Sequence, residues 1–259
     1  MISKKALLID TTMCIGCNAC QDACKKEFNL SGGDETTLSA TAYTALEQHG
    51  DTFVRRMCQH CLEPTCVSVC PVGAFTKTEA GPVLYDESKC IGCRYCIQAC
   101  PFQVPRYEWS SNYPRVQKCR FCADRIARGL QTACAEACPT GATKFGDRDE
   151  LIATAYERFK ADPTKYYPKI YGIQEAGGTS VLYLASVPFE QLGFKTKLQN
   201  TPFPMLTWNA LSKIPSVVSV GGVFLSGIWW ITNRRMKFMH EAGTNKKPGG
   251  NSNGNDHES

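Results

Sequence analysis

Residues 90–101 read Cys-Ile-Gly-Cys-Arg-Tyr-Cys-Ile-Gln-Ala-Cys-Pro, a run of four cysteines spaced C-x2-C-x2-C-x3-C and closed by proline. Four related runs account for all sixteen cysteines of the 259-residue chain, of which two keep this spacing without change and three end in Cys-Pro. They are Cys14, Cys17, Cys20 and Cys24; Cys58, Cys61, Cys66 and Cys70; Cys90, Cys93, Cys96 and Cys100; and Cys119, Cys122, Cys134 and Cys138. Because no cysteine is left over, one shared chemistry is expected for all of them.

This spacing is the ligand pattern of ferredoxin-type 4Fe–4S clusters. Three thiolates on a short loop can each reach a different iron corner of one cube, and the fourth cysteine ligates the neighbouring cluster. The sixteen thiolates therefore predict four 4Fe–4S clusters as cofactors. The glycines at Gly16 and Gly92 are expected to let the backbone approach the inorganic sulfides, where a Cβ would crowd it.

Two other uses of cysteine compete with this interpretation. Disulfide scaffolds belong to short secreted chains, and this chain is long. Zinc is the stronger rival, because C-x2-C pairs are common zinc ligands. Zinc sites use two separated pairs, however, whereas here a third cysteine follows in the same loop. The pattern favours clusters over a membrane-attached, zinc-binding structural protein.

The charge balance changes once clusters are counted. The formal net charge is +5, but each cluster with four thiolates carries about −2, which brings the loaded protein to about −3. The basic residues therefore give no reason to expect nucleic acid as a partner. Lys89, Arg94, Lys118 and Arg120 lie beside cysteines and are expected either to offset cluster charge or to be solvated loop residues.

The chain around the runs predicts an α+β fold of two two-cluster modules resembling bacterial ferredoxins, followed by one C-terminal transmembrane helix. Residues 5–10 predict a strand, and residues 74–78 and 83–86 predict a hairpin around a Gly-Pro turn. Residues 25–57 form an insertion between the first two runs. Residues 1–146 are expected to form the four-cluster domain, with the clusters serving as much of its core.

Residues 147–207 are expected to form an extension that packs on partner subunits. Asp147 is placed to cap a helix whose apolar positions recur at helical spacing, and residues 179–187 predict a strand. No catalytic group stands out in this region.

The last part of the chain predicts a membrane anchor. Residues 214–231 are eighteen residues without a charge, which span about 27 Å as a helix, close to the roughly 30 Å hydrocarbon core. Pro215 suits the first turn, and tryptophans near both ends suit the interfaces. We expect a transmembrane helix within residues 208–235 and a disordered cytoplasmic tail over residues 236–259.

Flanking charges predict the orientation of this helix. Arg234, Arg235, Lys237, Lys246 and Lys247 follow it, and fewer basic residues precede it. The positive-inside rule then places the C-terminus in the cytoplasm and the cluster domain in the periplasm, at the inner membrane. The N-terminal residues show no export signal, so we expect export together with a partner that carries one.

Several motifs carry a closer resemblance. The segments Cys58-Gln-His-Cys61-Leu-Glu-Pro-Thr-Cys66 and Lys118-Cys119-Arg-Phe-Cys122 resemble the four-cluster iron–sulfur subunits of the molybdopterin oxidoreductase family. Residues 165–171, 178–184 and 187–193, followed by one membrane helix, resemble a narrower branch. That branch holds the β subunits of membrane-bound formate dehydrogenases and of the type-2 nickel–iron hydrogenase.

The resemblance implies that run one pairs with run four and run two with run three. Four ligand sets follow from it: Cys14, Cys17, Cys20 and Cys138; Cys24, Cys119, Cys122 and Cys134; Cys58, Cys61, Cys66 and Cys100; and Cys70, Cys90, Cys93 and Cys96. One departure is that Lys25, instead of proline, follows Cys24, which affects the local geometry of that run.

The implied function is electron transfer without catalysis. The clusters would carry electrons between a catalytic molybdopterin subunit, of the formate dehydrogenase type, and a quinone-reactive membrane subunit that is a cytochrome b or a multi-span protein. The same relay in a nickel–iron hydrogenase is the alternative, and the missing export signal favours formate dehydrogenase. No dinucleotide fingerprint or acid–base pair points to an enzyme. His60 is expected to play a structural or supporting role rather than ligate a cluster.

Overall fold

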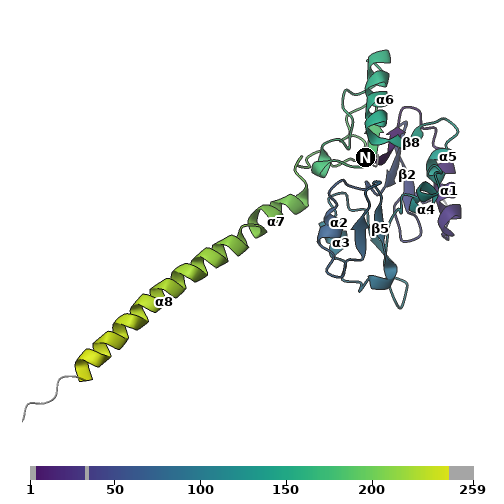
Figure 1. The fold of residues 1–259 in the computed structure, drawn as a ribbon. Helices are drawn as coiled ribbons and strands as arrows, with labels where there is room; N and C mark the ends of the chain where they lie inside the picture. Colours follow the sequence, from purple (N-terminus) through teal and green to yellow (C-terminus); the bar gives the residue numbers. More distant parts are fainter. Residues whose placement is uncertain (1–3, 33–34, 245–259) are drawn as a thin grey trace, which may run out of the picture. The chain divides into compact units, whose positions relative to one another are not determined.

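The computed structural model describes residues 4–32 and 35–244, and it divides into two units, residues 1–206 and residues 207–259. The first unit combines helices and short strands (Figure 1). Its strands are β1 Lys5–Asp10, β2 Thr44–His49, β3 Thr52–Met57, β4 Phe75–Lys77, β5 Val83–Tyr85, β6 Arg106–Tyr107, β7 Val116–Gln117, β8 Thr143–Asp147 and β9 Val181–Leu184. Its α-helices are α1 Ala19–Phe28, α2 Thr65–Ser68, α3 Tyr95–Ala99, α4 Ala123–Ala127, α5 Ala133–Glu136 and α6 Arg148–Ala161. Two 3-10 turns, η1 Glu87–Lys89 and η2 Glu175–Gly177, complete it.

A three-stranded sheet in the order β8-β1-β9 organises the first unit. The strand predicted over residues 5–10 is confirmed as β1, which pairs antiparallel with β8 and parallel with β9. The strand predicted over residues 179–187 is confirmed as the shorter β9. Strands β1 and β9, which pair in parallel, come from opposite ends of the unit's sequence. Both are buried on both faces, as is usual for parallel strands.

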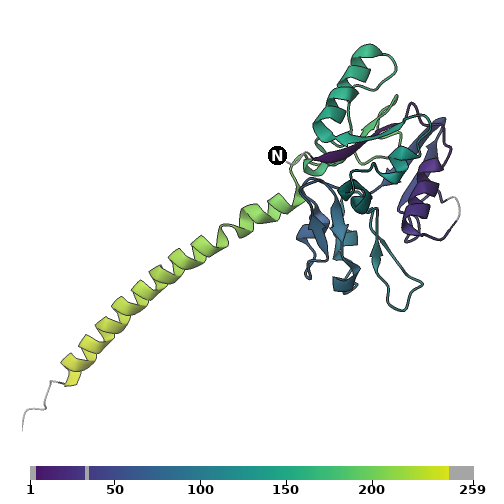
Figure 2. The ribbon, with the colours of Figure 1, turned by 45° about the vertical axis from the view of Figure 1, so that its right-hand side comes forward.

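The two faces of this sheet have different partners, because side chains alternate along a strand. Ala6 and Leu8 of β1 pack with Leu182 and Leu184 of β9 against α6, through Leu151 and Ala155 among others. The opposite face belongs to a second apolar cluster, which contains Leu7, Ile9 and Tyr183 together with several cysteines. Figure 2 shows α6 lying along the sheet.

The structure draws no division at residues 146–147, where the sequence predicted an extension to begin, and the packing of that extension on partner subunits stays a prediction. Residues 147–206 belong to the same unit as the cysteine runs, because β9 completes the central sheet and α6 covers one face of it. The extension was expected to pack on partners, yet its apolar residues bury themselves in the chain's own core. Sequence separation hid this contact, since the pairing of β1 with β9 is nonlocal.

Three two-stranded hairpins flank the cysteine loops, one of them the short β6–β7 pair between the third and fourth runs. The one predicted around residues 79–82 is confirmed, with Phe75 opposite Tyr85 and Lys77 opposite Val83. The insertion over residues 25–57 contains a second hairpin, β2–β3, which was not predicted. Its two six-residue strands are joined at Gly50, whose φ of +59° favours glycine.

The helices that follow the cysteine loops differ in length for a sequence reason. Pro71, Pro101 and Pro139 follow the last cysteine of their runs, and the helices before them end after four or five residues. Lys25 occupies that place in the first run, and α1 continues for ten residues through it. The departure noted from the sequence therefore lengthens a helix.

The helix expected after Asp147 is confirmed as α6, and Asp147 occupies its N-cap position. Its carboxylate, however, makes no side-chain cap bond to α6. It instead forms an ion pair of 2.5 Å with Lys5 across the β1–β8 edge. The Asp147 carboxylate thus pairs with Lys5 and does not cap the helix.

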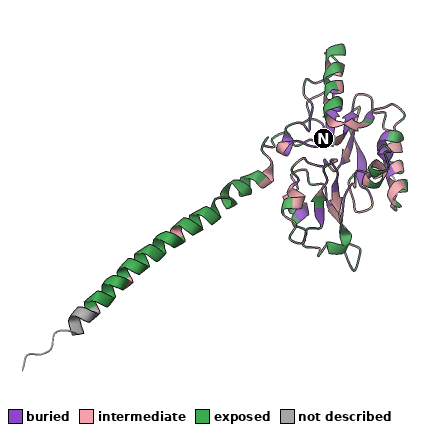
Figure 3. Ribbon diagram, viewed as in Figure 1, coloured by how far each residue is buried: buried purple, intermediate pink, exposed green. Residues whose placement is uncertain are grey.

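The second unit is helical. Helix α7, Phe203–Leu211, ends just before α8, Ile214–Thr244. Pro215 explains the interruption, since its missing N–H and its ring disrupt the bond to the carbonyl four residues earlier, at Leu211. The side chains of α8 up to Met239 are mostly exposed, as Figure 3 shows in green.

A stretch within residues 203–239 is long and apolar enough to cross a membrane. Residues 208–235 are largely helical, as expected, with an unexpected break between α7 and α8, and their passage through a membrane stays a prediction. The tail predicted over residues 236–259 begins instead as helix. Residues 236–242 contain no glycine or proline, so nothing in them opposes the continuation of α8. Residues 245–259 lie outside the described part of the chain.

Candidate functional site

The cysteines gather in groups of four that draw on more than one run. We call these groups quartets and number them from one to four. The first quartet is Cys14, Cys17, Cys20 and Cys138, which line one cavity. The second quartet lines another cavity and consists of Cys24, Cys119, Cys122 and Cys134. The fourth quartet lines a separate cavity and consists of Cys70, Cys90, Cys93 and Cys96. The third quartet is Cys58, Cys61, Cys66 and Cys100.

Mutual electrostatic effects tie the third quartet together. Burial raises the pKa of the Cys61 thiol well above its ordinary value, and the charges of Cys58, Cys100 and Cys66 raise it further. Burial likewise raises the pKa of Cys66 to about 12, again with contributions from Cys58 and Cys100. Cys100 comes from the third run and the others from the second, so these two runs meet here.

Helix packing repeats this pairing of runs. Helix α1 of the first run packs against α5 of the fourth, and α2 of the second run packs against α3 of the third. In Figure 1 the labels α1, α4 and α5 lie together, apart from α2 and α3. The three groups that line a cavity contain the same cysteines as ligand sets implied by the family resemblance, and cluster ligation by the quartets stays a prediction.

Two of the cysteine loops need glycine for their backbone conformation and packing. Gly16 and Gly92 adopt φ values of +73° and +71°, in the left-handed region that glycine tolerates. A Cβ at Gly16 would lie 2.6 Å from the Phe53 ring, and one at Gly92 would lie 3.0 Å from the Tyr107 hydroxyl. Glycine is therefore required here by packing on the protein side of the loop, which the sequence did not reveal.

Backbone amides donate to several of the sulfurs. The N–H of Ala74 lies 3.2 Å from Cys70 Sγ and that of Phe121 lies 3.3 Å from Cys119 Sγ. Such N–H···S bonds stabilise negative charge on sulfur and are one way in which proteins set cluster potentials. The loops thus supply both thiols and donors to the same spaces.

Most of the thiols are held in a low-dielectric setting. Burial raises the pKa of Cys96 to about 12 and that of Cys122 to about 11. Buried thiols favour the neutral form, so a metal centre must displace their protons on binding. This arrangement suits thiols that are meant to bind a positively charged iron core.

Exposure differs systematically among the quartets. All four cysteines of the second quartet are buried, whereas Cys17 of the first and Cys93 of the fourth are exposed. Ile15 and Ile91, beside these two thiols, are 61% and 65% exposed. The first and fourth quartets therefore reach the surface, and the second is enclosed.

Neighbouring charges also order the quartets. The charge of Cys134 in the second quartet contributes to the raised pKa of Cys20 in the first. The charge of Cys20 contributes in turn to the raised pKa of Cys24 in the second quartet. Burial raises the pKa of Cys119 well above its ordinary value, and Cys24, Cys58 and Cys122 raise it further, which makes the second and third quartets neighbours. Cys96 of the fourth quartet contributes in the same way to the raised pKa of Cys66 in the third.

The donor sets fit iron–sulfur clusters better than the rival groups. All sixteen cysteines lie in the described part of the chain and none forms a disulfide. In that same part, no three His, Cys, Asp or Glu side chains converge closely enough to hold a single metal ion. Thiols that line a shared cavity without converging on one point match a cube with four corners, and they argue against the zinc interpretation.

The charged residues singled out from the sequence have separate roles. Lys118 is buried, and its Nζ donates to the carbonyls of Val83 at 2.6 Å and Cys119 at 3.0 Å. Lys89 is a surface residue paired with Asp86 at 3.4 Å. Arg94 and Arg120 lie over aromatic rings. Of the four, Lys118 is placed most clearly inside the cysteine region.

His60 supports the cysteine region through its ring. It is fully buried, its Nδ1 accepts from the Val83 N–H at 2.9 Å, and the ring lies 4.6 Å from that of Phe121. Burial lowers its pKa well below the ordinary value, and Lys118 and Lys77 lower it further. The expected structural role for His60 agrees with these contacts.

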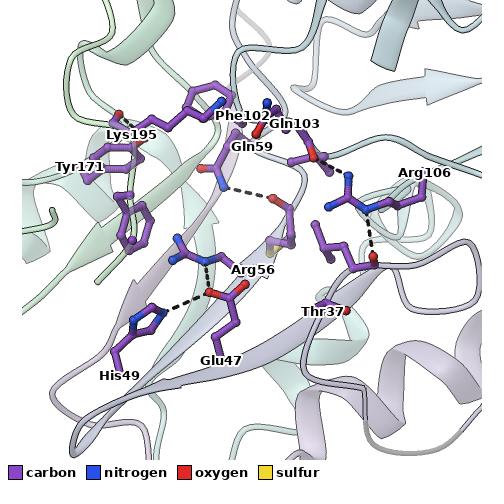
Figure 4. A pocket seen from close by; sticks show the side chains of 15 residues that line it. Thr37, Glu47, His49, Arg56, Gln59, Phe102, Gln103, Arg106, Tyr171 and Lys195 are labelled. Carbon is purple, nitrogen blue, oxygen red and sulfur yellow. Dashed lines mark hydrogen bonds and ion pairs between the residues drawn. The ribbon is translucent and has the colours of Figure 1, made fainter. Parts of the chain in front are cut away.

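A larger open cleft contains no cysteine. It is lined from the β2–β3 hairpin, the loop after Cys100 and the segment around Tyr171 (Figure 4). Arg56 pairs there with Glu47 at 2.7 Å, and Arg106 donates to the carbonyl of Leu38 at 2.9 Å. Both cations are engaged in internal contacts.

The fold and the cysteine cavities define a ferredoxin-type iron–sulfur protein. A model of the 4Fe–4S dicluster domain matches residues 51–148, which cover three of the four runs. A protein of Nitratidesulfovibrio vulgaris is 39% identical over 253 residues, covering 91% of this chain and 68% of that protein.

Two further relatives have informative names. The hydrogenase-2 operon protein HybA of Escherichia coli is 32% identical over 300 residues, covering 98% of this chain and 88% of the relative. The iron–sulfur subunit of the nitrate-inducible formate dehydrogenase of Escherichia coli is 36% identical over 202 residues, covering 70% of this chain and 68% of that subunit. The chain belongs to this family of iron–sulfur electron-transfer subunits.

Proposed function

We propose that this chain is a relay of four 4Fe–4S clusters, each held by one of the four quartets. The observation that carries the proposal is that every cysteine falls into one of four groups of four, three of which line a cavity of their own. A cluster supplies one-electron chemistry when bound. The chain's own residues ligate it, bury it and donate hydrogen bonds to its sulfur.

The clusters are proposed to follow one another in the order of the quartets, from first to fourth. This order is supported by neighbouring charges, which link the first quartet to the second, the second to the third and the third to the fourth. The exposed ends, at Cys17 with Ile15 and at Cys93 with Ile91, are where electrons would enter and leave. The enclosed second quartet would serve only within the relay.

The partners are proposed to be a catalytic oxidoreductase subunit, of the molybdopterin formate dehydrogenase type, and an integral membrane subunit that reacts with quinone. The formate dehydrogenase subunits among the relatives support this assignment. The relative HybA, named for a hydrogenase-2 operon, keeps a nickel–iron hydrogenase as the second candidate. In either complex this chain conducts electrons and performs no substrate chemistry.

The apolar surface of α8 supports membrane attachment. Val217, Val218, Val220 and Val223 are all more than 60% exposed, and their positions point in different directions around the helix axis. In the described part of the chain nothing covers them, and apolar side chains on all sides of a helix suit lipid. Basic residues after the apolar stretch favour a cytoplasmic C-terminus and a periplasmic cluster region at the inner membrane.

Metal analysis combined with ligand substitution tests the relay. The full-length chain, purified anaerobically in detergent, should contain about sixteen iron and sixteen sulfide per chain. Cys14→Ser and Cys138→Ser should alter the same electron paramagnetic resonance signal, although the two residues belong to different runs. Cys24→Ser and Cys134→Ser should share a different signal. Zinc without sulfide, or signals that follow the runs instead of the quartets, would contradict the proposal.

Substrate and orientation need separate measurements. Membranes that hold the intact complex should reduce quinone with formate as the donor, and hydrogen-dependent reduction without formate activity would favour the hydrogenase candidate. In right-side-out spheroplasts, protease should reach the cluster region. Complete protection there would reject a periplasmic location and leave the cluster assignment standing.

A further inference from the structure

Arg55 is a buried cation for which the described residues supply no carboxylate partner. It lies on β3 and is only 2% exposed, which is rare for an arginine unless it is paired. In the described part of the chain no carboxylate forms an ion pair with it. Its Nη2 donates to Met57 Sδ at 3.1 Å, while Nε and Nη1 find no hydrogen-bond acceptor there.

The surroundings of Arg55 belong to two quartets. Its side chain lines the cavity of the first quartet together with Cys14, Cys17 and Cys20. Its charge also acts on Cys134 and Cys24 of the second quartet. A guanidinium carries five N–H donors in a planar fork, so one side chain can serve acceptors on two sides.

Burial without an anion is costly for a guanidinium, and clusters provide what is missing. A buried charge needs a counter-charge and acceptors for its donors. Each loaded quartet carries about −2, and its sulfurs accept hydrogen bonds. The pattern of burial, unmatched donors and neighbouring thiols therefore indicates a residue built for the loaded state.

Strand register explains how Arg55 reaches this place. Successive side chains on a strand alternate between faces, so Arg55 shares a face with Phe53, which lies against Gly16 of the first cysteine loop. Arg56 faces the other way, where it pairs with Glu47 and lies over the Phe194 ring at 4.3 Å. Two adjacent arginines thus have different environments, and Arg56 provides a matched control.

We propose that Arg55 sets the potentials of the first two clusters of the relay by donating hydrogen bonds to sulfur in both quartets. Reduction of a cluster from the 2+ to the 1+ state adds one electron, taken from its neighbour in the relay, and no proton. The added negative charge is stabilised by a fixed cation nearby, so Arg55 raises the reduction potential at both positions. This inference rests on the proposed relay and adds a positioning residue to it.

A redox titration of variants tests this role. The full-length chain is purified anaerobically in detergent with any subunits that accompany it, as wild type, Arg55→Gln, Arg55→Lys and Arg56→Gln. Iron and sulfide are counted, and the cluster signals are titrated by electron paramagnetic resonance. Cys17→Ser and Cys24→Ser identify the signals of the first and second quartets.

Arg55→Gln with full iron should lower both of these potentials and leave the other two unchanged. The oxidised-to-reduced ratio at a fixed potential should rise at least tenfold, which is 59 mV for one electron. Arg55→Lys should shift the same signals by less, because it keeps the charge and loses the fork. Arg56→Gln should shift none.

Two outcomes would overturn the inference: full cluster content with both potentials unchanged, or an equal shift in all four. If Arg55→Gln loses iron, Arg55→Lys decides. A lowered potential at the first or second quartet in that variant supports the role, and unchanged potentials or lost clusters contradict it. A wild-type protein without about sixteen iron and sulfide would instead count against the relay itself.

Discussion

The close contact between Gly16 and Phe53 gives a sharp test of how the first cysteine loop is held. Gly16 has φ +73°, and a Cβ there would lie 2.6 Å from Phe53 Cζ, well inside van der Waals contact. Gly129 has nearly the same φ, +76°, but a Cβ there would meet nothing within 4 Å. Alanine at Gly129 therefore reports backbone strain alone, and alanine at Gly16 reports strain and collision together.

The two costs can be separated by magnitude. A left-handed alanine costs roughly 1–2 kcal/mol, which is the whole expected effect of Gly129→Ala. Overpacking adds about 1–3 kcal/mol at Gly16, because the Phe53 ring or the cysteine loop must move. Since each 1.4 kcal/mol is a factor of ten, the collision should speed cluster loss by about five- to hundredfold over the control.

The assay follows loss of cluster absorbance in urea under anaerobic conditions, with iron content measured before denaturant is added. Adding Phe53→Ala should relieve the collision. The step from Phe53→Ala to the double variant should then cost no more than Gly129→Ala costs in the wild type. Equal rates for Gly16→Ala and Gly129→Ala, or no relief by Phe53→Ala, would refute the contact as the cause.

Three other outcomes are expected. Leu8 of β1 is fully buried against α6, so Leu8→Ala should destabilise the protein by about 2–5 kcal/mol and lower its urea midpoint. Leu130→Ala at the surface should change stability by less than about 0.5 kcal/mol. Similar midpoints for the two variants would contradict the sheet as the core. Val223→Arg should make the free energy of membrane insertion less favourable by about 2.5–3.5 kcal/mol and reduce retention of the protein in membranes after carbonate extraction. Val223→Leu is the control. Full retention of the arginine variant would argue against a transmembrane α8. Ile91→Asp should weaken co-purification of a partner while leaving iron content intact, and an unchanged complex would remove the fourth quartet from the docking surface.

The predictable features of this chain are those written locally in the sequence. Strand β1 and the β4–β5 hairpin follow from short apolar segments and a Gly-Pro turn, and α8 follows from uncharged length. The pairing of β1 with β9 was missed because it joins residues more than 170 positions apart, and local patterns carry no record of such contacts. The grouping of the cysteines came from family resemblance, since spacing alone leaves open which runs meet.

The buried state of Arg55 was hidden for a related reason. Charged residues are almost never fully buried unless paired, so an Arg-Arg pair in an insertion gives no signal of a buried site. One available signal was the pair of six-residue segments around Gly50, which would have predicted the β2–β3 hairpin and its alternation. That alternation would have separated Arg55 from Arg56.

The β2–β3 hairpin shows what the insertion over residues 25–57 contributes near the first quartet. Its pairing places Leu46 opposite Arg55 and Gln48 opposite Phe53, and this register turns Phe53 toward the first cysteine loop and Arg55 toward the first cavity. A slip by one residue would reverse both side chains and bring Val54 and Arg56 to the cysteines instead. The hairpin's register therefore controls the loop geometry and the local charge of the first quartet at once. A change that shifts this register should disturb cluster binding and potential together, which separates it from Gly16→Ala or Arg55→Lys, each of which acts on one of the two.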